Sequence, residues 1–228
     1  MIGIIGAMDE EIQYLLEHME DKQEVTVAHS RFVKGELEGK EIVLLKSGIG
    51  KVNAAMGTTI MMERFSPEAV INTGSAGGFS ERLEVGDLVI SSEVVQHDVD
   101  VTAFDYEYGQ VPGLPTFIPA SDKLVELTAG AVKELNIQYE IGLIATADTF
   151  MADQSKVQET RGKFPQMIAA EMEGAAIAQV CHQYDVPFVI IRALSDIAGK
   201  DSSVTFDAFL ETAAKHAAQL IMKVVKAM

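Results

Sequence analysis

Short apolar runs alternate along this chain with longer segments in which apolar residues recur at helical spacing. The short runs predict buried strands, and the longer segments predict amphipathic helices. The predicted strands cover residues 2–6, 25–33, 41–46, 69–72, 87–95, 141–147, 168–170 and 187–194. The predicted helices cover residues 8–19, 51–65, 124–135, 154–162, 174–184 and 206–225. Asp153 stands where an N-cap residue would precede the fourth helix, and residues 98–119 predict one long loop.

Strands that are apolar throughout and separated by helices are typical of a mostly parallel sheet that helices cover on both faces. The length of 228 residues, with no linker, repeat or low-complexity run, favours a single α/β domain over residues 1–228. In such sheets, ligands bind beyond the carboxyl ends of the strands. Polar and Gly-rich segments fall at those ends, at residues 6–8, 47–50, 73–78, 147–151, 171–173 and 195–196. We therefore expect a ligand site at that edge of the sheet.

None of the Gly-rich segments completes a familiar nucleotide-binding or hydrolase motif. Asn53 stands where a dinucleotide fingerprint needs its third glycine, and Val52 follows Lys51 with no glycine at P-loop spacing before it. Thr73 occupies the first glycine position of a nucleophile elbow. A turn that needs positive φ explains each segment taken alone. Several such turns at one edge of a sheet favour a site where backbone amides approach a ligand.

Carboxylates near the predicted ligand edge are the sharper signal. Glu10 and Glu11 open the first helix, where acids can also simply complement the helix dipole. Glu171 and Glu173 bracket one residue directly after a buried strand, so that one of them can reach a pocket while the other serves structure. Asp196 ends an apolar strand, a position that suits a general acid, although an N-cap role is the alternative.

Composition narrows the classes of partner. The chain has 18 Lys and Arg against 34 Asp and Glu, and its net charge of −16 argues against nucleic acid and membrane surfaces. One cysteine, no basic leader and no apolar run of about 18 residues fit a cytoplasmic protein without a membrane span. His97, Asp98 and Asp100 lack further clustered ligands, so we expect neither a metal nor a cofactor. A mean hydropathy of +0.15 with no Trp indicates that some surface is buried against another chain.

Six segments together resemble the bacterial 5′-methylthioadenosine/S-adenosylhomocysteine nucleosidases of the nucleoside phosphorylase superfamily. The segments are GIIGAMDEE (3–11), LKSGIGKV (45–52), INTGSAGG (71–78), HDVDVTAF (97–104), EME (171–173) and RALSD (192–196). Asp9 and Gly174 are small departures from the family pattern. The resemblance implies a nucleoside phosphorylase-like, three-layer α/β/α fold around a mixed, mostly parallel, twisted sheet. It also implies hydrolysis of the N-glycosidic bond of methylthioadenosine, adenosylhomocysteine and 5′-deoxyadenosine, in methionine salvage and the activated methyl cycle.

The same resemblance implies roles for residues of one pocket. Asp196 would protonate adenine N7 with Ser195 orienting it, Glu11 would activate the attacking water, and Glu173 would hold the ribose 2′-OH. The other substrate-binding residues that it implies are Met8, Ile49, Ser75, Ala76, Gly77, Phe150, Met151, Glu171, Met172 and Phe206. The neighbouring subunit of a homodimer would add apolar residues beside the 5′-alkylthio group, namely Val101, Phe104 and Pro112.

Two other functions compete with hydrolysis. A phosphorylase of the same fold would hold a phosphate dianion with arginines, whereas this chain offers Asp9, Glu10 and Glu11 at that turn, and carboxylates repel phosphate. A non-catalytic adenosine-binding protein would have no need of acids at both Glu11 and Asp196. Release of free adenine from methylthioadenosine without phosphate distinguishes hydrolysis from both alternatives.

Overall fold

The computed structural model describes residues 1–199 and 202–228, apart from the side chains of residues 202–205 and 207, and these residues form one sheet of eleven strands. The strands are β1 (Ile2–Gly6), β2 (Glu20–Val27), β3 (Ser30–Leu37), β4 (Lys40–Lys46), β5 (Ala69–Asn72), β6 (Ser75–Gly78), β7 (Leu88–Gln96), β8 (Ile118–Pro119), β9 (Tyr139–Thr146), β10 (Met167–Glu171) and β11 (Phe188–Ile197). Their order across the sheet is β2-β3-β4-β1-β5-β11-β6-β10-β9-β7-β8.

The two halves of the sheet differ in how their strands pair. In the first half, β4, β1, β5 and β11 are parallel neighbours, and the antiparallel pair β2–β3 extends the sheet beyond β4. In the second half, β11 pairs with both β6 and β7. The pairings β6–β10, β10–β9 and β9–β7 then complete a closed ring of five strands. In this closed half, the ends of β6, β9, β10 and β11 lie close to one another.

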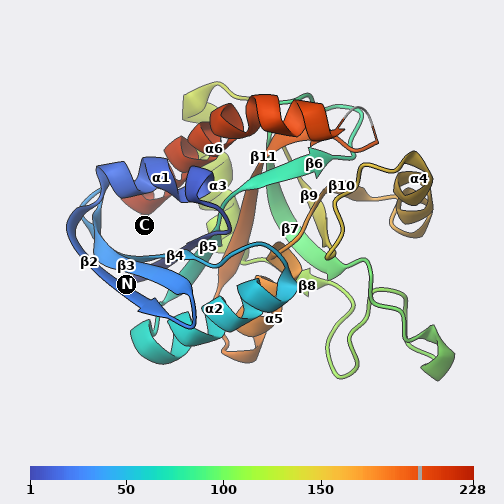
Figure 1. The fold of residues 1–228 in the computed structure, drawn as a ribbon, viewed down its shortest axis with the longest axis horizontal. Coiled ribbons are helices and arrows are strands. Elements are labelled where there is room, and N and C mark those ends of the chain that lie inside the picture. Colours follow the sequence, from blue (N-terminus) through green and yellow to red (C-terminus); the bar gives the residue numbers. More distant parts are fainter. Residues whose placement is uncertain (200–201) are drawn as a thin grey trace.

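Helices cover both faces of the sheet, so that the molecule has three layers (Figure 1). On one face lie α1 (Asp9–His18), α3 (Asp122–Leu135) and α6 (Ser202–Ala227), and on the other lie α2 (Lys51–Phe65) and α5 (Gly174–Gln183). Each face has its own hydrophobic core, the first dominated by α6 and the second by α2 and the alanine-rich α5. α4 (Gln154–Lys163) lies apart from these layers, beyond the closed half of the sheet.

The predicted α/β class is confirmed, and β1, α2 and β5 have the predicted bounds. The predicted strand over residues 25–33 is wrong, because it runs across the turn between β2 and β3. Ala28 and His29 both have positive φ there, 49° and 64°, which turns a hairpin instead of extending a strand. The sequence pattern also misses β6, because glycine and serine are rare in strands. The N-cap predicted for α4 is confirmed, since the Asp153 side chain accepts hydrogen bonds from the N–H groups of Ser155 and Lys156.

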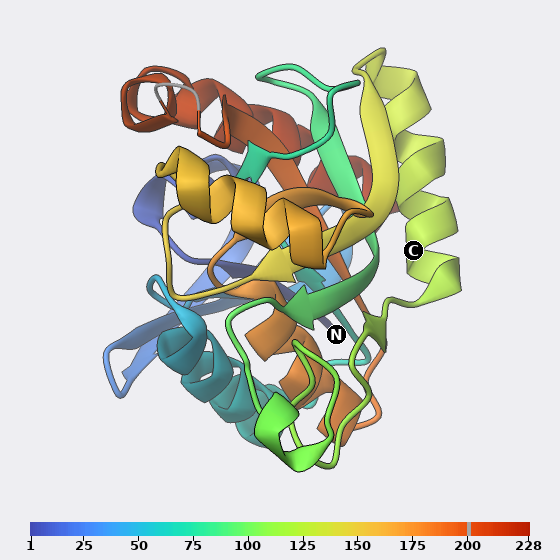
Figure 2. The same ribbon diagram turned by 90° about the vertical axis from the view of Figure 1, so that its right-hand side faces the viewer.

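The segment between β7 and β8, residues 97–117, extends away from the body of the molecule in Figure 1 and lies toward the viewer in Figure 2. The sequence predicts a plain loop there, whereas the segment contains a 3₁₀ helix over Thr102–Phe104 and is followed by the short strand β8. We call residues 97–117 the protruding segment. Within the described residues, no helix is both long and apolar enough to cross a membrane.

Candidate active site

A cavity of about 360 Å³ opens where β1, β9, β10 and β11 end. It is lined by every residue that the sequence predicts for the pocket within one chain, namely Met8, Glu11, Ile49, Ser75, Ala76, Gly77, Phe150, Met151, Glu171, Met172, Glu173, Ser195, Asp196 and Phe206. Its lining also includes residues that sequence reasoning does not single out, namely Ala7, Thr149, Ala170 and Arg192. The cavity thus lies at the expected edge of the sheet, while the chemical roles of its residues stay predictions.

Glu11, in the first turn of α1, is a buried acceptor held by four donors. Its Oε2 accepts hydrogen bonds from the N–H groups of Ala7 at 2.8 Å and Met8 at 3.2 Å. Its Oε1 accepts from the N–H of Ser75 at 3.0 Å and from the Ser75 hydroxyl at 3.2 Å. Both oxygens are therefore oriented before any ligand arrives. A carboxylate fixed in this way can take a proton from a bound water.

Asp196 reaches the cavity from the end of β11 and is also buried. The Ser195 hydroxyl donates to Asp196 Oδ1 at 3.0 Å and lies 3.4 Å from the carbonyl oxygen of Ala76. Asp196 is opposite Gly77 in the pairing of β11 with β6. A Cβ atom at Gly77 would come within 3.3 Å of Asp196 Oδ2. The glycine therefore leaves room for the carboxylate beside the strand.

β6 contacts both Glu11 and Asp196. Ser75 binds Glu11 and Gly77 lies against Asp196, and positions two residues apart along a strand are separated by about 7 Å. The two carboxylates are therefore held at different positions along the same strand, as an acid and a water-activating carboxylate must be in glycoside hydrolysis.

Glu171, the last residue of β10, binds protein groups through both of its oxygens. The Thr146 hydroxyl donates to its Oε1, and the Arg192 guanidinium donates to its Oε2. The N–H groups of Glu173 and Gly174 also donate to Oε2, at 3.0 and 2.7 Å. Glu171 thus binds the amino-terminal end of α5 and anchors Arg192. These bonds favour a structural role for its carboxylate over direct contact with a ligand.

Glu173 accepts a hydrogen bond from the Gly50 N–H at 2.8 Å and another from Arg192 Nη2 at 3.3 Å. Burial raises the pKa of Glu173 from 4.5 to about 7, although the charge of Arg192 lowers it. The neighbouring Glu171 and Glu11 carboxylates raise the pKa, and the Gly50 N–H lowers it. The protonation of Glu173 therefore responds to small changes in its surroundings near neutral pH.

Arg192 is a buried cation at the cavity that the sequence reasoning missed. Besides the two glutamates, its Nη2 donates to Asn72 Oδ1 at 2.8 Å, and its Nη1 donates to the carbonyl oxygen of Ser75 at 3.2 Å. The available signal was an arginine inside an otherwise apolar strand, because a buried arginine needs acidic partners. Since Glu171 and Glu173 both pair with Arg192, its charge is balanced within the protein.

Aromatic rings form another wall of the cavity. The rings of Phe150 and Phe206 meet edge to face, with centroids 5.8 Å apart and an interplanar angle of 79°. The carbonyl oxygen of Phe150 accepts from the Ala152 N–H at 3.0 Å, and that of Met151 accepts from the Gly199 N–H at 3.2 Å. Phe150 is partly exposed at the cavity, so its ring offers a face on which a flat base can stack.

The sequence analysis predicts that three residues serve a neighbouring subunit, namely Val101, Phe104 and Pro112. Among the described residues, none of these three lines the cavity of its own chain. They belong to the protruding segment, and the Phe104 side chain is 76% exposed. Their contribution to a second subunit stays a prediction.

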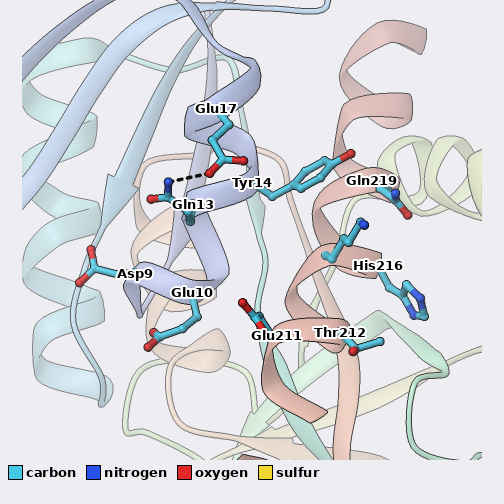
Figure 3. Close-up of a pocket in the computed structure, with 10 residues that line it drawn as sticks. Asp9, Glu10, Gln13, Tyr14, Glu17, Glu211, Thr212, His216 and Gln219 are labelled. Atoms are coloured by element: carbon cyan, nitrogen blue, oxygen red, sulfur yellow. Dashed lines mark hydrogen bonds between the residues drawn. The ribbon is translucent and has the colours of Figure 1, made fainter. Parts of the chain in front are cut away.

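A larger groove of about 840 Å³ lies between α1 and α6 (Figure 3), and we call it the α1–α6 groove. It is lined by Asp9, Glu10, Gln13, Tyr14, Glu17, Glu211, Thr212, Lys215, His216 and Gln219. Figure 3 shows these side chains projecting from the two helices, with Gln13 donating to Glu17 at 2.8 Å. The lining is polar and charged apart from the Tyr14 ring, whereas small-molecule sites have mainly apolar and aromatic walls.

The α1–α6 groove corrects one expectation about the acidic turn at the start of α1. Asp9 and Glu10 line the groove, and Asp9 pairs with Lys46 at 2.8 Å. Of the three acids expected to repel phosphate, Glu11 alone lines the cavity. Successive helical residues point about 100° apart, so neighbours in sequence face different sites.

The sequence analysis considered a metal at residues 97–100 and set it aside, and the two acids of that segment have other partners. Asp98 pairs with Lys51 at 2.6 Å, and Asp100 accepts from the N–H and hydroxyl of Thr102. His97 is buried, which lowers its pKa. Among the described residues, no group of three or more His, Cys, Asp or Glu side chains is placed to hold a metal ion.

Comparison with known proteins gives the same family over nearly the whole chain. The model of the phosphorylase superfamily matches residues 1–226. The chain is 58% identical over 226 residues to the 5′-methylthioadenosine/S-adenosylhomocysteine nucleosidase of Bacillus subtilis, covering 99% of this chain and 98% of that protein. It superposes with a TM-score of 0.98 on the nucleosidase of Neisseria meningitidis in complex with methylthio-immucillin-A, at 46% identity over 100% of this chain and 99% of that one. The TM-score is 0.96 for the nucleosidase of Colwellia psychrerythraea in complex with adenine, at 50% identity over 98% of this chain and 93% of that one. The chain therefore belongs to the phosphorylase superfamily and, within it, to the family of the 5′-methylthioadenosine/S-adenosylhomocysteine nucleosidases.

Proposed function

We propose that this chain hydrolyses the N-glycosidic bond of 5′-methylthioadenosine, S-adenosylhomocysteine and 5′-deoxyadenosine. The observation that carries the proposal is one cavity in which two of the buried carboxylates, Glu11 and Asp196, lie against two different positions of β6. The names of the relatives, and the adenine and methylthio-immucillin-A bound to two of them, support methylthioadenosine and adenosylhomocysteine as substrates. The first two substrates would yield adenine together with 5-methylthioribose or S-ribosylhomocysteine.

Cleavage of the C1′–N9 bond produces an oxocarbenium-like sugar, so the leaving adenine must be protonated and the sugar must meet a nucleophile. In this proposal, Asp196 gives a proton to adenine N7 while the Ser195 hydroxyl holds its Oδ1. Glu11 takes a proton from the water whose oxygen bonds to C1′. The proton gained by Glu11 balances the proton lost by Asp196, so the reaction consumes one water and no net proton.

The remaining residues of the cavity would hold the substrate. Glu173, fixed by Gly50 and Arg192, would accept a hydrogen bond from the ribose 2′-OH. The Phe150 ring would stack on adenine, and the backbone near Met151 would meet the edge of the base. Residues along the base and sugar would be Ser75, Ala76, Gly77 and Met172. The 5′-alkylthio group would lie among apolar side chains, namely Met8, Ile49 and Phe206.

The charges around the cavity favour hydrolysis over phosphorolysis. A phosphate dianion needs cations that are free to bind it. The cation among the lining residues, Arg192, is already paired with Glu171 and Glu173. Glu11 adds another carboxylate on the side from which a nucleophile would approach.

The proposal includes a homodimer of one catalytic domain, residues 1–228, in the cytoplasm. Val101, Phe104 and Pro112 of one subunit would complete the 5′ end of the partner's cavity. This part rests on exposed apolar surface, because Phe104 is 76% exposed and Val52 is 77% exposed. A second chain that covered such side chains would remove apolar surface from water, which favours association.

Release of adenine from methylthioadenosine in phosphate-free buffer tests the proposed function. We expect adenine and 5-methylthioribose in equal amounts, and added phosphate should not change the rate. A requirement for phosphate, with a sugar 1-phosphate as product, would indicate a phosphorylase. Binding without turnover would indicate a non-catalytic adenosine-binding protein. Asp196→Asn, assayed beside the wild type, checks that the released adenine comes from this site.

A further inference from the structure

The amino-terminal end of α2 binds two separate walls of the cavity. The first N–H groups of a helix have no partners inside the helix. In α2, the N-cap residue Gly50 has no side chain to serve them, and the first turn contains no acid. The Gly50 N–H donates instead to Glu173 Oε1, and the Lys51 N–H donates to Asp148 Oδ1, both at 2.8 Å. Adjacent backbone groups thus hold acids that are far apart in the sequence.

Asp148 belongs to the segment that carries the aromatic wall. It follows β9 and directly precedes Thr149, Phe150 and Met151, which line the cavity. A carboxylate at a helix amino-terminus is favoured both by the hydrogen bond and by the helix dipole. The bond to Lys51 therefore ties the aromatic wall to the first turn of α2.

Asp98 and Lys51 hold Asp148 from a second direction. Lys51 Nζ lies 2.6 Å from Asp98 Oδ1, and Asp98 Oδ2 accepts from the Asp148 N–H at 3.2 Å. The side chains of Lys51 and Asp98 are 18% and 31% exposed, so water screens this pair less than a pair on the open surface. Asp148 is consequently fixed through its side chain and through its backbone.

Gly50 allows Asp148 to come this close to α2. Its φ is +95°, a conformation that side chains with a Cβ rarely adopt, and a Cβ there would lie 3.0 Å from Asp148 Oδ1. The same glycine donates to Glu173. Gly50 therefore fixes the position of Glu173 through its N–H and limits how close Asp148 can come to α2.

We propose that Asp148 is a positioning residue, which holds the Phe150 and Met151 wall in register with Glu173 through the first turn of α2. The inference rests on the proposed function, in which that wall receives adenine and Glu173 receives the ribose. Asp148 acts through these residues and touches no reacting atom. A shift of the base by about 1 Å would move N7 away from Asp196, and misplacement on that scale costs about 10²-fold in rate.

Asp148→Ala and Asp148→Asn test the proposal together, because the asparagine oxygen still caps a helix. We expect Asp148→Ala to lower kcat for methylthioadenosine by about 10- to 10²-fold. The inhibition constant of adenine should rise in the same variant. Asp148→Asn should restore most of the activity. Asp98→Asn removes the charge opposite Lys51. It should also lower kcat and raise the inhibition constant of adenine, each by a smaller factor than Asp148→Ala.

Asp153→Ala is the matched control. Asp153 is also an exposed aspartate that caps a helix, and it lies at the other end of the same segment, before α4. Its loss should lower Tm by about as much as the loss of Asp148 and leave kcat and adenine inhibition unchanged. Equal kinetic effects of the two alanine variants, or a wild-type kcat in Asp148→Ala, would overturn the positioning role.

Amide exchange at Lys51 in the ligand-free protein gives a readout that does not depend on catalysis. Asp148→Ala should speed the exchange of the Lys51 N–H, and Asp153→Ala should not. Unchanged exchange in Asp148→Ala would contradict the capping bond. If Asp148→Ala does not fold, Asp98→Asn carries the kinetic test against the same control. A wild type that releases no adenine would refute the proposed function and leave the exchange result standing.

Discussion

Three buried carboxylates of the cavity, Glu11, Glu173 and Asp196, differ in their partners, and the partners favour different chemistry. Glu11 faces four donors, so its oxygens are set up to accept. Asp196 faces a hydroxyl on Ser195 and the bare backbone of Gly77. Glu173 shares Arg192 with another acid, and burial raises its pKa to about 7. In the proposed mechanism these three carboxylates serve as base, acid and binding group, respectively Glu11, Asp196 and Glu173, and each has different neighbours.

Asp196→Asn removes the proton that the proposed mechanism gives to adenine N7, while the amide keeps the shape of the side chain. General-acid assistance is typically worth about 10²- to 10⁴-fold, so kcat should fall by a factor in that range. Adenine binding should be retained. Steady-state kinetics with methylthioadenosine and titration calorimetry with adenine measure the two effects. A loss of only a few-fold in kcat would remove Asp196 from the acid role.

Glu11→Gln should lose both activity and stability. The N–H groups of Ala7, Met8 and Ser75 all donate to Glu11, and the new amide NH₂ would face one of these donors. A buried donor without an acceptor costs about 1–3 kcal/mol. Urea unfolding and adenine release measure the two losses. Glu10→Gln, which changes the neighbouring acid in the α1–α6 groove, is the control and should alter neither.

Glu173 should make the stability of the protein depend on pH. Burial raises its pKa to about 7 in the folded protein, above the ordinary value of 4.5. Between these values the folded protein keeps a proton that the unfolded chain releases, so the free energy of unfolding falls as the pH rises from 4.5 to about 7. Glu173→Gln removes this titration. Urea unfolding at about pH 5 and about pH 8 measures how much the free energy of unfolding falls between these two pH values. The fall should be larger for the wild type than for Glu173→Gln, and equal falls would contradict the raised pKa of Glu173.

The sequence predicts the acids of the cavity because Glu173 and Asp196 follow predicted strands whose carboxyl ends meet at one edge. It does not predict Arg192, because a lone arginine in an apolar run shows its partners only after the sheet has brought Glu171 beside it. Although the family resemblance separates Glu11 from Glu10, the residue pattern alone does not, since that difference depends on how α1 is rotated against its neighbours.

Among the elements, β6 has an importance that its composition conceals. This strand of four residues runs between β11 and β10, binds Glu11 through Ser75 and makes room for Asp196 at Gly77. Small residues suit this strand because Glu11 lies against Ser75 and Asp196 lies against Gly77. The composition that keeps β6 from being predicted as a strand is therefore the composition that its place in the cavity demands.

Gly74→Ala should lower both stability and activity at the start of β6. Gly74 has a φ of +154°, and a Cβ there would lie 2.6 Å from Glu11 Oε1 and against the Arg192 guanidinium. Overpacking of this kind costs about 1–3 kcal/mol and would displace Glu11. Thermal unfolding and adenine release measure the change. Gly39→Ala is the control, because Gly39 also has positive φ, +76°, but nothing lies within 4 Å of the new Cβ. Equal losses in the two variants would assign the effect to backbone strain alone.

The fold could be predicted where local pattern decides the structure, as in α2 and β1. The hairpin of β2 and β3 resembles one strand in the sequence because strand-type residues flank Ala28 and His29 with no Gly or Pro between them, and only the positive φ values reveal the turn. The closed ring of five strands depends on β11 pairing with both β6 and β7. Pairings between distant segments leave no periodicity in the sequence, so this closure could not be predicted.

For the whole molecule, net charge and exposed apolar surface act in opposite directions. Two copies with a charge of −16 repel each other, so any association needs apolar burial to offset the repulsion. Exposed apolar side chains occur on α2, at Val52 and Met56, and on the protruding segment, at Phe104 and Tyr106. Figures 1 and 2 both show these two elements on the lower side of the molecule. The proposed dimer would therefore form through this side, and added salt should strengthen it by screening the charges.

Phe104→Asp should weaken the proposed homodimer and raise KM for methylthioadenosine. The Phe104 side chain is 76% exposed in the single chain, and the 5′-alkylthio group of the substrate needs an apolar wall. Burial of each methylene is worth about 0.8 kcal/mol, so a carboxylate in that wall should weaken substrate binding as well as association. Inhibition by adenine should change less, because the base would meet Phe150 and Asp196 of its own chain.

Sedimentation velocity at low micromolar concentration measures the dimer, and initial rates measure KM for methylthioadenosine. Val25→Asp, at a 42% exposed position on β2, is the matched control and should change neither. A wild type that is fully active as a monomer would show that each cavity is complete within one chain and that the shared site is wrong.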